Sequence, residues 1–171
     1  PGISSAASDV YKRQYLHRVL EGLRLDTKLS IVWDCGNGVA GPCLDKLSKS
    51  LSGEHEVLFA DVDGNFPNHH PDPTIEKNLE TLITRVKKRN ADLGIAFDGD
   101  GDRIGVIDNL GKILWGDQLL AILAEDVLLE QPGSTIIGDV KASQGLFDRI
   151  TALGGLSLIH ISEPTRHERL S

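Results

Sequence analysis

The sequence predicts an α/β fold built in layers. Short apolar runs rich in β-branched residues recur along the chain, and segments with leucine and isoleucine at helical spacing stand between them. Loops rich in glycine, proline and asparagine separate the two kinds of segment. Strands that alternate with helices almost throughout are typical of a layered α/β domain.

The first part of the chain supplies five predicted elements. In chain order they are a strand at 29–35, a helix at 43–51, a strand at 56–63, a loop at 64–73 and a helix at 74–91. The first helix places Leu44, Leu47 and Leu51 on one face, and Pro42 occupies a position that a first helical turn tolerates. The second helix carries Lys87, Lys88 and Arg89 at its carboxyl end, where the helix dipole favours cations.

The second part continues the alternation. We expect strands at 92–97 and 103–108, a turn with a short edge strand at 109–116, a helix at 117–133, a strand at 134–140 and a helix at 143–155. Asp117 and Ser143 are the expected helix caps. One structural unit is expected to close, and a second to begin, near residues 109–116.

The two ends are set aside from the fold prediction. Residues 4–14 (SSAASDVYKRQ) and the tail from Leu156 (LSLIHISEPTR) look like in-frame translations of sequencing-library adaptors. We therefore expect residues 1–14 and 156–171 to be non-native and residues 15–155 to be the native segment, a piece of a longer protein.

Composition excludes several classes of function. The chain is 40% hydrophobic and 25% charged with a formal charge of −7, so it lacks the basic stripe that a nucleic-acid partner requires. No apolar run approaches the ~18 residues of a membrane span. Cys35 and Cys43 form neither a disulfide framework nor a zinc set. A reducing cytoplasm is the expected location.

A glycine-rich turn follows the first strand. Residues 36–41 (GNGVAG) match G-x-G-x-x-G, and Asp61 ends the next strand about 20 residues on, which is the context of a dinucleotide fingerprint. The alternative is a strand-to-helix turn that simply needs glycine with positive φ. Both interpretations stay open on the residues alone.

The densest cluster of charge lies at 98–103 (DGDGDR). In an extended strand Asp98 and Asp102 would be ~13 Å apart, whereas Mg²⁺ takes oxygen ligands at about 2.1 Å. Gly99 and Gly101 allow the backbone to curl, so the pattern favours a compact cation site. An exposed Asp-Gly hairpin and a D-x-D nucleotide-sugar transferase are the alternatives. A calcium EF-hand is excluded, because Arg103 stands where the loop requires glycine.

At this point the sequence resembles the α-D-phosphohexomutases, in their phosphomannomutase/phosphoglucomutase branch. The stretches that carry the resemblance are DCGNGVAG, DVDGNFPNHHPDP, ADLGIAFDGDGDRIGVID and GDVKASQGL, in family order. The resemblance implies an α/β/α domain with a mixed sheet, followed by a truncated second α/β domain of the same type. Residues 15–113 would be domain 2 and residues 114–155 the start of domain 3.

The resemblance also implies a reaction. A phosphoserine exchanges a phosphoryl group with hexose 1- and 6-phosphates of mannose or glucose, through a hexose 1,6-bisphosphate. Asp98, Asp100 and Asp102 would bind Mg²⁺ beside that phosphoserine, and Arg103 would bind phosphate oxygens, for which its planar fork is suited. The competing interpretation of Arg103 is a salt bridge to an aspartate of its own loop.

Other parts of the family pattern are not found in the sequence. A Thr-Ala-Ser-His-Asn-Pro-like phosphoserine loop would precede Tyr15, and a Gly-Glu-x-Ser-Gly-His sugar loop would follow Gly155, so this piece alone is expected to be inactive and to hold no catalytic residue. A dinucleotide-binding oxidoreductase domain and a non-catalytic metal-binding module remain the alternatives. The weaker candidates are His69 and His70 as cleft or turn residues, Lys141 as a sugar contact or simply a surface lysine, and Cys35 as a small buried residue. The oligomeric state is left open.

Overall fold

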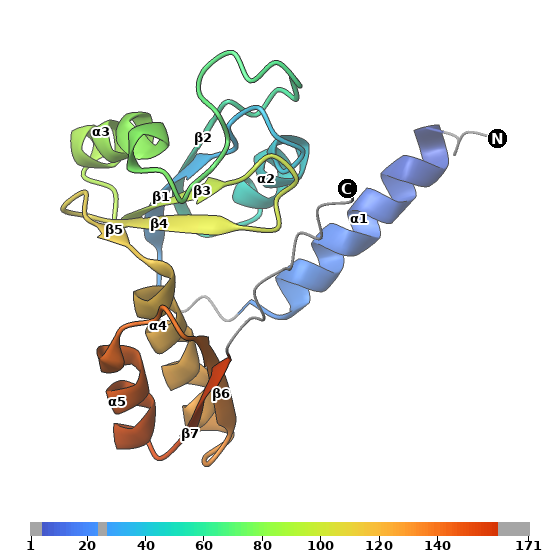
Figure 1. The fold of residues 1–171 in the computed structure, drawn as a ribbon. Coiled ribbons are helices and arrows are strands. Elements are labelled where there is room, and N and C mark those ends of the chain that lie inside the picture. Colours follow the sequence, from blue (N-terminus) through green and yellow to red (C-terminus); the bar gives the residue numbers. More distant parts are fainter. Residues whose placement is uncertain (1–4, 24–26, 161–171) are drawn as a thin grey trace, which may run out of the picture. The chain divides into compact units, whose positions relative to one another are not determined.

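The computed structural model describes residues 5–23 and 27–160 (Figure 1). It divides into two compact units, Pro1–Ile113 and Leu114–Ser171, and each is described by itself. Within the described ranges, no helix combines the length and the apolar character that crossing a membrane requires.

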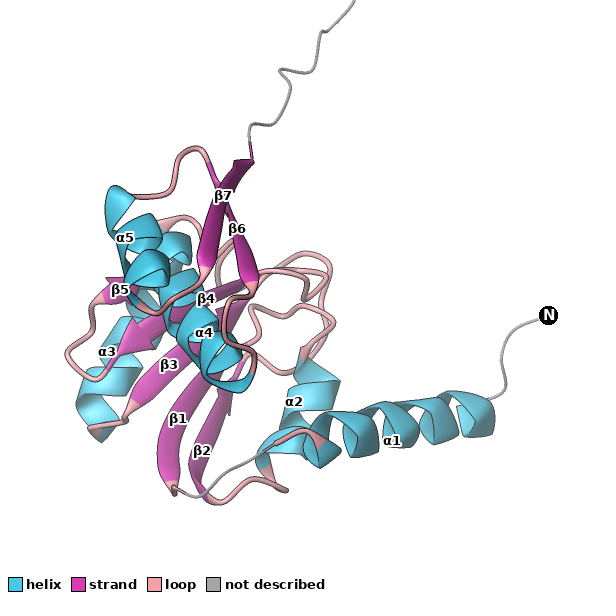
Figure 2. Ribbon diagram, turned by 90° about the horizontal axis from the view of Figure 1, so that it is seen from below, coloured by secondary structure: helices cyan, strands magenta, loops and turns pink. Residues whose placement is uncertain are grey.

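The first unit is built on a five-stranded sheet with the order β2-β1-β3-β4-β5. The strands are β1 (Leu29–Asp34), β2 (Gly53–Leu58), β3 (Leu93–Phe97), β4 (Ile104–Asp108) and β5 (Ile113–Leu114). β1 runs parallel to both β2 and β3, whereas β3 and β4 are antiparallel (Figure 2). The predicted α/β fold with a mixed sheet is therefore confirmed.

Helices cover both faces of this sheet. α3 (Glu80–Arg89), preceded by the 3₁₀ turn η1 (Glu76–Leu79), packs on one face, and α2 (Gly41–Ser48) packs on the other (Figure 1). Side chains alternate along β1 as its period of two requires: Val32 joins the α3 core, while Ile31 and Trp33 join the α2 core. The expected α/β/α layering is present.

The largest departures from the predicted elements lie in the second strand, in the helix after the long loop and at the amino-terminal end. β2 begins at Gly53 and ends at Leu58, three to five residues before the predicted strand, because Phe59 has a φ of 52° and cannot continue an extended chain. The helix predicted from Thr74 begins as the 3₁₀ turn η1 and becomes α-helical at Glu80. Helix α1 (Ser5–Glu21) runs through the segment set aside from the fold prediction and contacts α2.

The second unit contains α4 (Gly116–Glu130), β6 (Thr135–Asp139), α5 (Gln144–Ala152) and β7 (Leu156–His160). β6 and β7 pair in parallel, and the two helices share a core of Ala124, Leu128, Leu146, Phe147 and Ile150. β7 lies in the tail that the sequence analysis left out, so this strand was missed.

The expected cap at Asp117 was wrong. α4 begins at Gly116 with Trp115 as its N-cap, so Asp117 already lies inside the helix. Its carboxylate accepts the backbone N–H groups of Gln118 at 2.9 Å and of Ser143 at 3.1 Å. Ser143 does occupy the N-cap of α5, but its side chain makes no capping hydrogen bond.

Candidate metal centre

Three loops meet at one edge of the first sheet. β1, β2 and β3 are parallel, so their carboxyl ends lie at the same edge. The β1–α2 turn (residues 35–40), the long loop after β2 (residues 59–75) and the β3–β4 loop (residues 98–103) all leave from it. We call the last of these the carboxylate loop.

The carboxylate loop curls rather than extending. Asp98 is buried, with 1% of its surface exposed, while Asp100 and Asp102 are exposed. Gly101 has a φ of 77°, and one carboxylate oxygen from each aspartate lies within 4.8 Å of the others. Ligands on opposite sides of a Mg²⁺ ion are about 4.2 Å apart, so this oxygen-only set is of the size and chemistry that a hard divalent cation accepts.

The loop is also the hairpin that the alternative interpretation required. It joins two antiparallel strands, and the Asp98 N–H donates to the Arg103 carbonyl at 3.2 Å. A hairpin turn alone does not explain a buried carboxylate. Asp98 is the feature that distinguishes this loop from an ordinary exposed turn.

Hydrogen bonds keep Asp98 ionised. Burial acts to raise the pKa of Asp98, but hydrogen bonds from the backbone and side chain of Arg103 outweigh it and lower that pKa to about 2. The charges of Asp100 and then Asp98 raise the pKa of the exposed Asp102. The cluster thus holds crowded negative charge that a cation would relieve.

Arg103 reaches aspartates in two loops. Its Nε donates to Asp98 at 2.8 Å, and its Nη1 lies 3.4 Å from Asp72 in the loop after β2. The predicted salt bridge within its own loop is therefore formed. The guanidinium side chain is nevertheless 54% exposed, so part of its fork remains accessible to an anion.

The glycine-rich turn has few N–H groups to offer a ligand. The backbone N–H groups of residues 36, 37, 38, 39 and 41 donate to Asp34 Oδ1 and to the carbonyls of Phe59, Cys35, Gly99 and Gly38, respectively. In α2, Pro42 has no N–H, and the N–H groups of Cys43 and Leu44 both donate to the Ala40 carbonyl. A dinucleotide pyrophosphate binds to free N–H groups at this position. The geometry therefore disfavours the dinucleotide interpretation.

The same turn supports the carboxylate loop. The Val39 N–H donates to the Gly99 carbonyl at 3.0 Å. A Cβ at Gly38 would lie 2.8 Å from the Gly99 oxygen and 3.1 Å from the Asp98 oxygen. Gly38 is therefore glycine because the backbone of the carboxylate loop passes against it.

The loop after β2 is tied to the same edge by side chains. His69 Nε2 lies 3.1 Å from both carboxylate oxygens of Asp34, which is fully buried at the end of β1. Asn68 donates to the Asn37 side chain at 2.7 Å. His69 thus has a turn role, while His70 is exposed and lies edge-on to the Phe66 ring. Asp34 was not among the predicted site residues, although an acidic residue at the end of an otherwise apolar strand was a signal.

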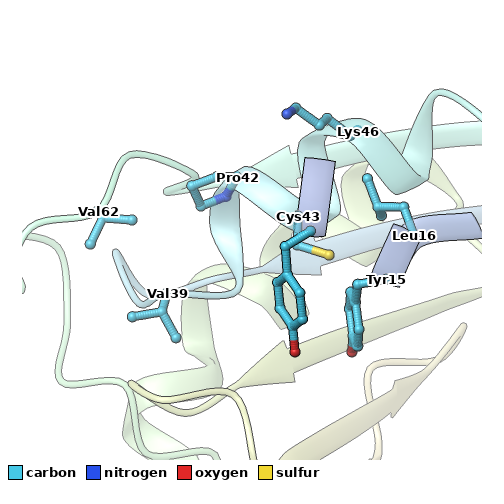
Figure 3. Close-up of a pocket in the computed structure, with 8 residues that line it drawn as sticks. Tyr15, Leu16, Val39, Pro42, Cys43, Lys46 and Val62 are labelled. Atoms are coloured by element: carbon cyan, nitrogen blue, oxygen red, sulfur yellow. The ribbon is translucent and has the colours of Figure 1, made fainter. Parts of the chain in front are cut away.

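Neither cysteine has the lowered thiol pKa of a reactive cysteine. Burial raises the pKa of the Cys35 thiol to about 12, and burial also raises that of Cys43. Cys43 lines an apolar hollow of about 350 Å³ together with Tyr15 and Leu16 of α1, which lie beside it in Figure 3. In the second unit, Lys141 is exposed and borders a separate hollow of about 550 Å³ with Asp117 and Asp139.

Comparison with known proteins gives a consistent family. The family model described as phosphoglucomutase/phosphomannomutase, alpha/beta/alpha domain II, matches residues 13–111. A phosphomannomutase/phosphoglucomutase of Pseudomonas putida is 49% identical over 146 residues, which are 85% of this chain and 32% of that protein. A phosphoglucomutase of Neisseria meningitidis serogroup B is 44% identical over 154 residues, which are 90% of this chain and 33% of that protein.

Solved structures agree. A phosphoglucomutase/phosphomannomutase family protein from Burkholderia thailandensis superimposes with a TM-score of 0.84 at 44% identity, over 88% of this chain and 33% of the other. The chain therefore spans about a third of the length of the relatives it matches.

Proposed function

Because this chain belongs to the phosphoglucomutase/phosphomannomutase family, through that family's alpha/beta/alpha domain II, we propose that it is the metal-binding part of a longer hexose-phosphate mutase. Residues 15–113 are domain 2 and residues 114–155 are the start of domain 3 in this proposal, and residues 1–14 and 156–171 are not native. The reaction interconverts hexose 1- and 6-phosphates by way of a phosphoserine and a hexose 1,6-bisphosphate. Mannose and glucose phosphates are the expected substrates, because the relatives are named for them. A cytoplasmic location stays a prediction.

The observation that carries the proposal is the curled carboxylate loop. Asp98, Asp100 and Asp102 would hold Mg²⁺ there, since their oxygens converge. Arg103 pairs with Asp98 and Asp102 and offsets only part of the negative charge of the three carboxylates. When bound, the ion would supply charge stabilisation to a transferring phosphoryl group.

The chain's own residues have separate tasks. Asp98 is fixed in its ionised form by two hydrogen bonds from Arg103, so it offers a ligand oxygen whose orientation is set before any ion arrives. Arg103 would present the exposed part of its guanidinium to phosphate oxygens while Asp98 and Asp72 hold it in place. The phosphoserine is not among these residues, so this chain alone is expected to have no mutase activity.

Paramagnetic relaxation tests the metal site even where binding is weak. Substoichiometric Mn²⁺ should selectively broaden the amide signals of Gly99 and Gly101 in the full chain, and excess Mg²⁺ should restore them. Asp100→Asn should abolish the broadening, whereas Asp61→Asn, an exposed carboxylate outside the cluster, should leave it unchanged. Broadening that is absent from residues 98–103, or that survives Asp100→Asn, would contradict the metal assignment.

A second experiment separates an enzyme from a non-catalytic metal module. The locus is sequenced beyond both ends, and the extended protein is assayed for conversion of mannose and glucose 1-phosphates. We expect activity that Asp100→Asn lowers by about a hundredfold or more, the scale for loss of an electrostatic stabiliser. Metal binding without activity would favour the module. NADH binding to the chain would instead revive the dinucleotide alternative.

A further inference from the structure

Both ring nitrogens of His69 face hydrogen-bond acceptors. Nε2 lies 3.1 Å from each carboxylate oxygen of Asp34, and Nδ1 lies 3.1 Å from the carbonyl oxygen of His70. A carbonyl oxygen can only accept, so Nδ1 must carry a proton. A carboxylate can only accept as well, so Nε2 must carry one too. The ring that satisfies both contacts is the doubly protonated imidazolium.

The surroundings of the pair favour this charge state. Asp34 is fully buried at the end of β1, and the Gly36 N–H donates to its Oδ1 at 2.9 Å, so this carboxyl group is held in place beside the His69 ring. The hydrogen bond to Asp34 raises the pKa of His69, although partial burial opposes it. The Phe59 ring lies edge-on to the His69 ring at 5.5 Å and carries no charge.

The ion pair holds the loop that reaches Arg103. Pro71, two residues after His69, packs against both glycine-containing turns. A Cβ placed at Gly36 would lie 2.8 Å from the Pro71 Cβ, and a Cβ placed at Gly99 would lie 3.4 Å from the Pro71 ring. Asp72, the next residue, contacts Arg103 Nη1 at 3.4 Å. The chain thus runs from the buried pair to the guanidinium in three residues, with a rigid proline between.

We propose that His69 is an imidazolium counter-ion of Asp34 at neutral pH, and that this pair is the clasp by which residues 59–75 position Arg103 beside the carboxylate loop. His69 is a positioning residue and not an acid or base, because neither ring nitrogen is free to exchange a proton with a substrate. A role of Arg103 in phosphoryl transfer rests on the proposed function. The protonation state of His69 and the hydrogen-exchange protection of residues 59–75 do not depend on it, so the clasp and the proposed function can be refuted independently.

The charge is tested in the wild-type chain by a pH titration of the histidine ring ¹⁵N signals, with His69→Gln used to assign them. We expect His69 to stay doubly protonated to a midpoint above its ordinary value of about 6.5, because the hydrogen bond to Asp34 favours the charged ring. Asp34→Asn should lower that midpoint, and His70→Gln, which keeps the His70 carbonyl, should not. A midpoint at or below the ordinary value of about 6.5, or a ring with only one protonated nitrogen at neutral pH, would overturn the imidazolium assignment.

The clasp is tested by hydrogen exchange at fixed pH below the midpoint. In His69→Gln, the amides of Asp63 and Phe66 and the Nε–H of Arg103 should exchange at least about tenfold faster than in wild type, with β1 and β3 amides unchanged. His70→Gln is the matched control and should leave the Asp63 amide and the Arg103 Nε–H unchanged; the Phe66 amide is left out of this comparison, because the His70 ring lies against the Phe66 ring. Less than a twofold change in His69→Gln would overturn the clasp.

If His69→Gln fails to fold, the clasp can be tested in the wild-type chain by the pH dependence of hydrogen exchange. A group with a raised pKa stabilises fully below its unfolded-state pKa of about 6.5, and that contribution is lost as pH rises through the folded-state value. Protection factors for the loop, corrected for intrinsic exchange rates, should therefore fall through the His69 midpoint while those of β1 hold. Protection that stays constant across the midpoint would equally overturn the clasp.

Discussion

Arg103 and Asp98 form a two-point contact across the carboxylate loop: the backbone N–H of Arg103 donates to Oδ1 at 3.0 Å and its Nε donates to Oδ2 at 2.8 Å. One residue therefore supplies a main-chain and a side-chain donor to the same buried carboxylate. The contact closes the hairpin and fixes the plane of the Asp98 carboxyl group. It also sets how this unit responds to acid.

Acid should weaken the first unit through Asp98. Its pKa is lowered to about 2 from an ordinary value near 3.8, so its stabilising contribution is present above the unfolded-state pKa and is lost as pH falls toward 2. We expect a loss on the order of 1 kcal/mol in the free energy of unfolding between pH 6 and pH 3, the upper part of that window, with more lost below pH 3. Asp98→Asn should remove this pH dependence and lower stability at neutral pH.

Urea unfolding from pH 3 to 6 measures this loss. Trp33 is buried in the first unit, and replacing Trp115, the other tryptophan, by Phe would leave a single fluorescence reporter. Asp61→Asn serves as the control because it is an exposed carboxylate outside the cluster. Parallel pH profiles for wild type and Asp98→Asn would contradict the assignment.

Neutralising Asp102 should have opposite effects with and without a divalent ion. The charges of Asp100 and Asp98 raise the pKa of Asp102, which means that its negative charge is repelled in the folded state. Asp102→Asn should therefore raise the melting temperature of the metal-free chain. It should also abolish the rise in melting temperature that Mg²⁺ or Mn²⁺ causes in the wild-type chain. Thermal unfolding with chelator and with metal tests both parts, and a lower metal-free melting temperature would refute the first.

Gly38→Ala should disturb the carboxylate loop without altering a carboxylate. The new methyl would meet the Gly99 and Asp98 carbonyl oxygens at 2.8 and 3.1 Å, so the loop must shift. We expect a cost of about 1–3 kcal/mol, typical of overpacking, and loss of Mn²⁺ broadening at Gly99. Gly64→Ala is the control, because no atom lies within 4 Å of its Cβ position. Equal behaviour of the two variants would show that the close approach is unimportant.

Two substitutions at the start of α5 can be compared in the second unit. Asp117 accepts the Ser143 N–H at the start of α5, whereas the Ser143 hydroxyl makes no capping bond. Asp117→Ala should lower the free energy of unfolding of this unit by about 1 kcal/mol, and Ser143→Ala should change it by less than about 0.5 kcal/mol. Unfolding followed by Trp115 fluorescence in a Trp33→Phe background compares them. A larger loss for Ser143→Ala than for Asp117→Ala would show that the Ser143 side chain caps α5 after all.

Elements with a clear period were predictable from the sequence. The strand at 29–34 and the helix after it follow directly from an apolar run and a leucine spacing. The curl of the carboxylate loop followed from alternating aspartate and glycine. These features depend on neighbours within a few residues, so they can be read without a tertiary structure.

Features that join distant segments were not predictable. Asp34 and His69 are 35 residues apart, and nothing in either local pattern indicates the other. The end of β2 at Leu58 depends on the positive φ of Phe59, whose carbonyl accepts the Asn37 N–H from the glycine turn. Such contacts form only once parallel strands bring their carboxyl ends together, so tertiary packing decides them.

The antiparallel pairing of β3 with β4 makes the length of the carboxylate loop intolerant of change. Phe97 pairs with Ile104, and Ala96 pairs with Gly105. Six residues therefore connect the two strands, and the pairing of β3 with β4 fixes both ends of this connection. Deleting or inserting one residue would either slip this register, turning Ile107 out of the core and Val106 into its place, or force a bulge at the cluster. Natural variation in this hairpin should therefore occur by substitution, and single-codon insertions here should be among the most damaging in the gene.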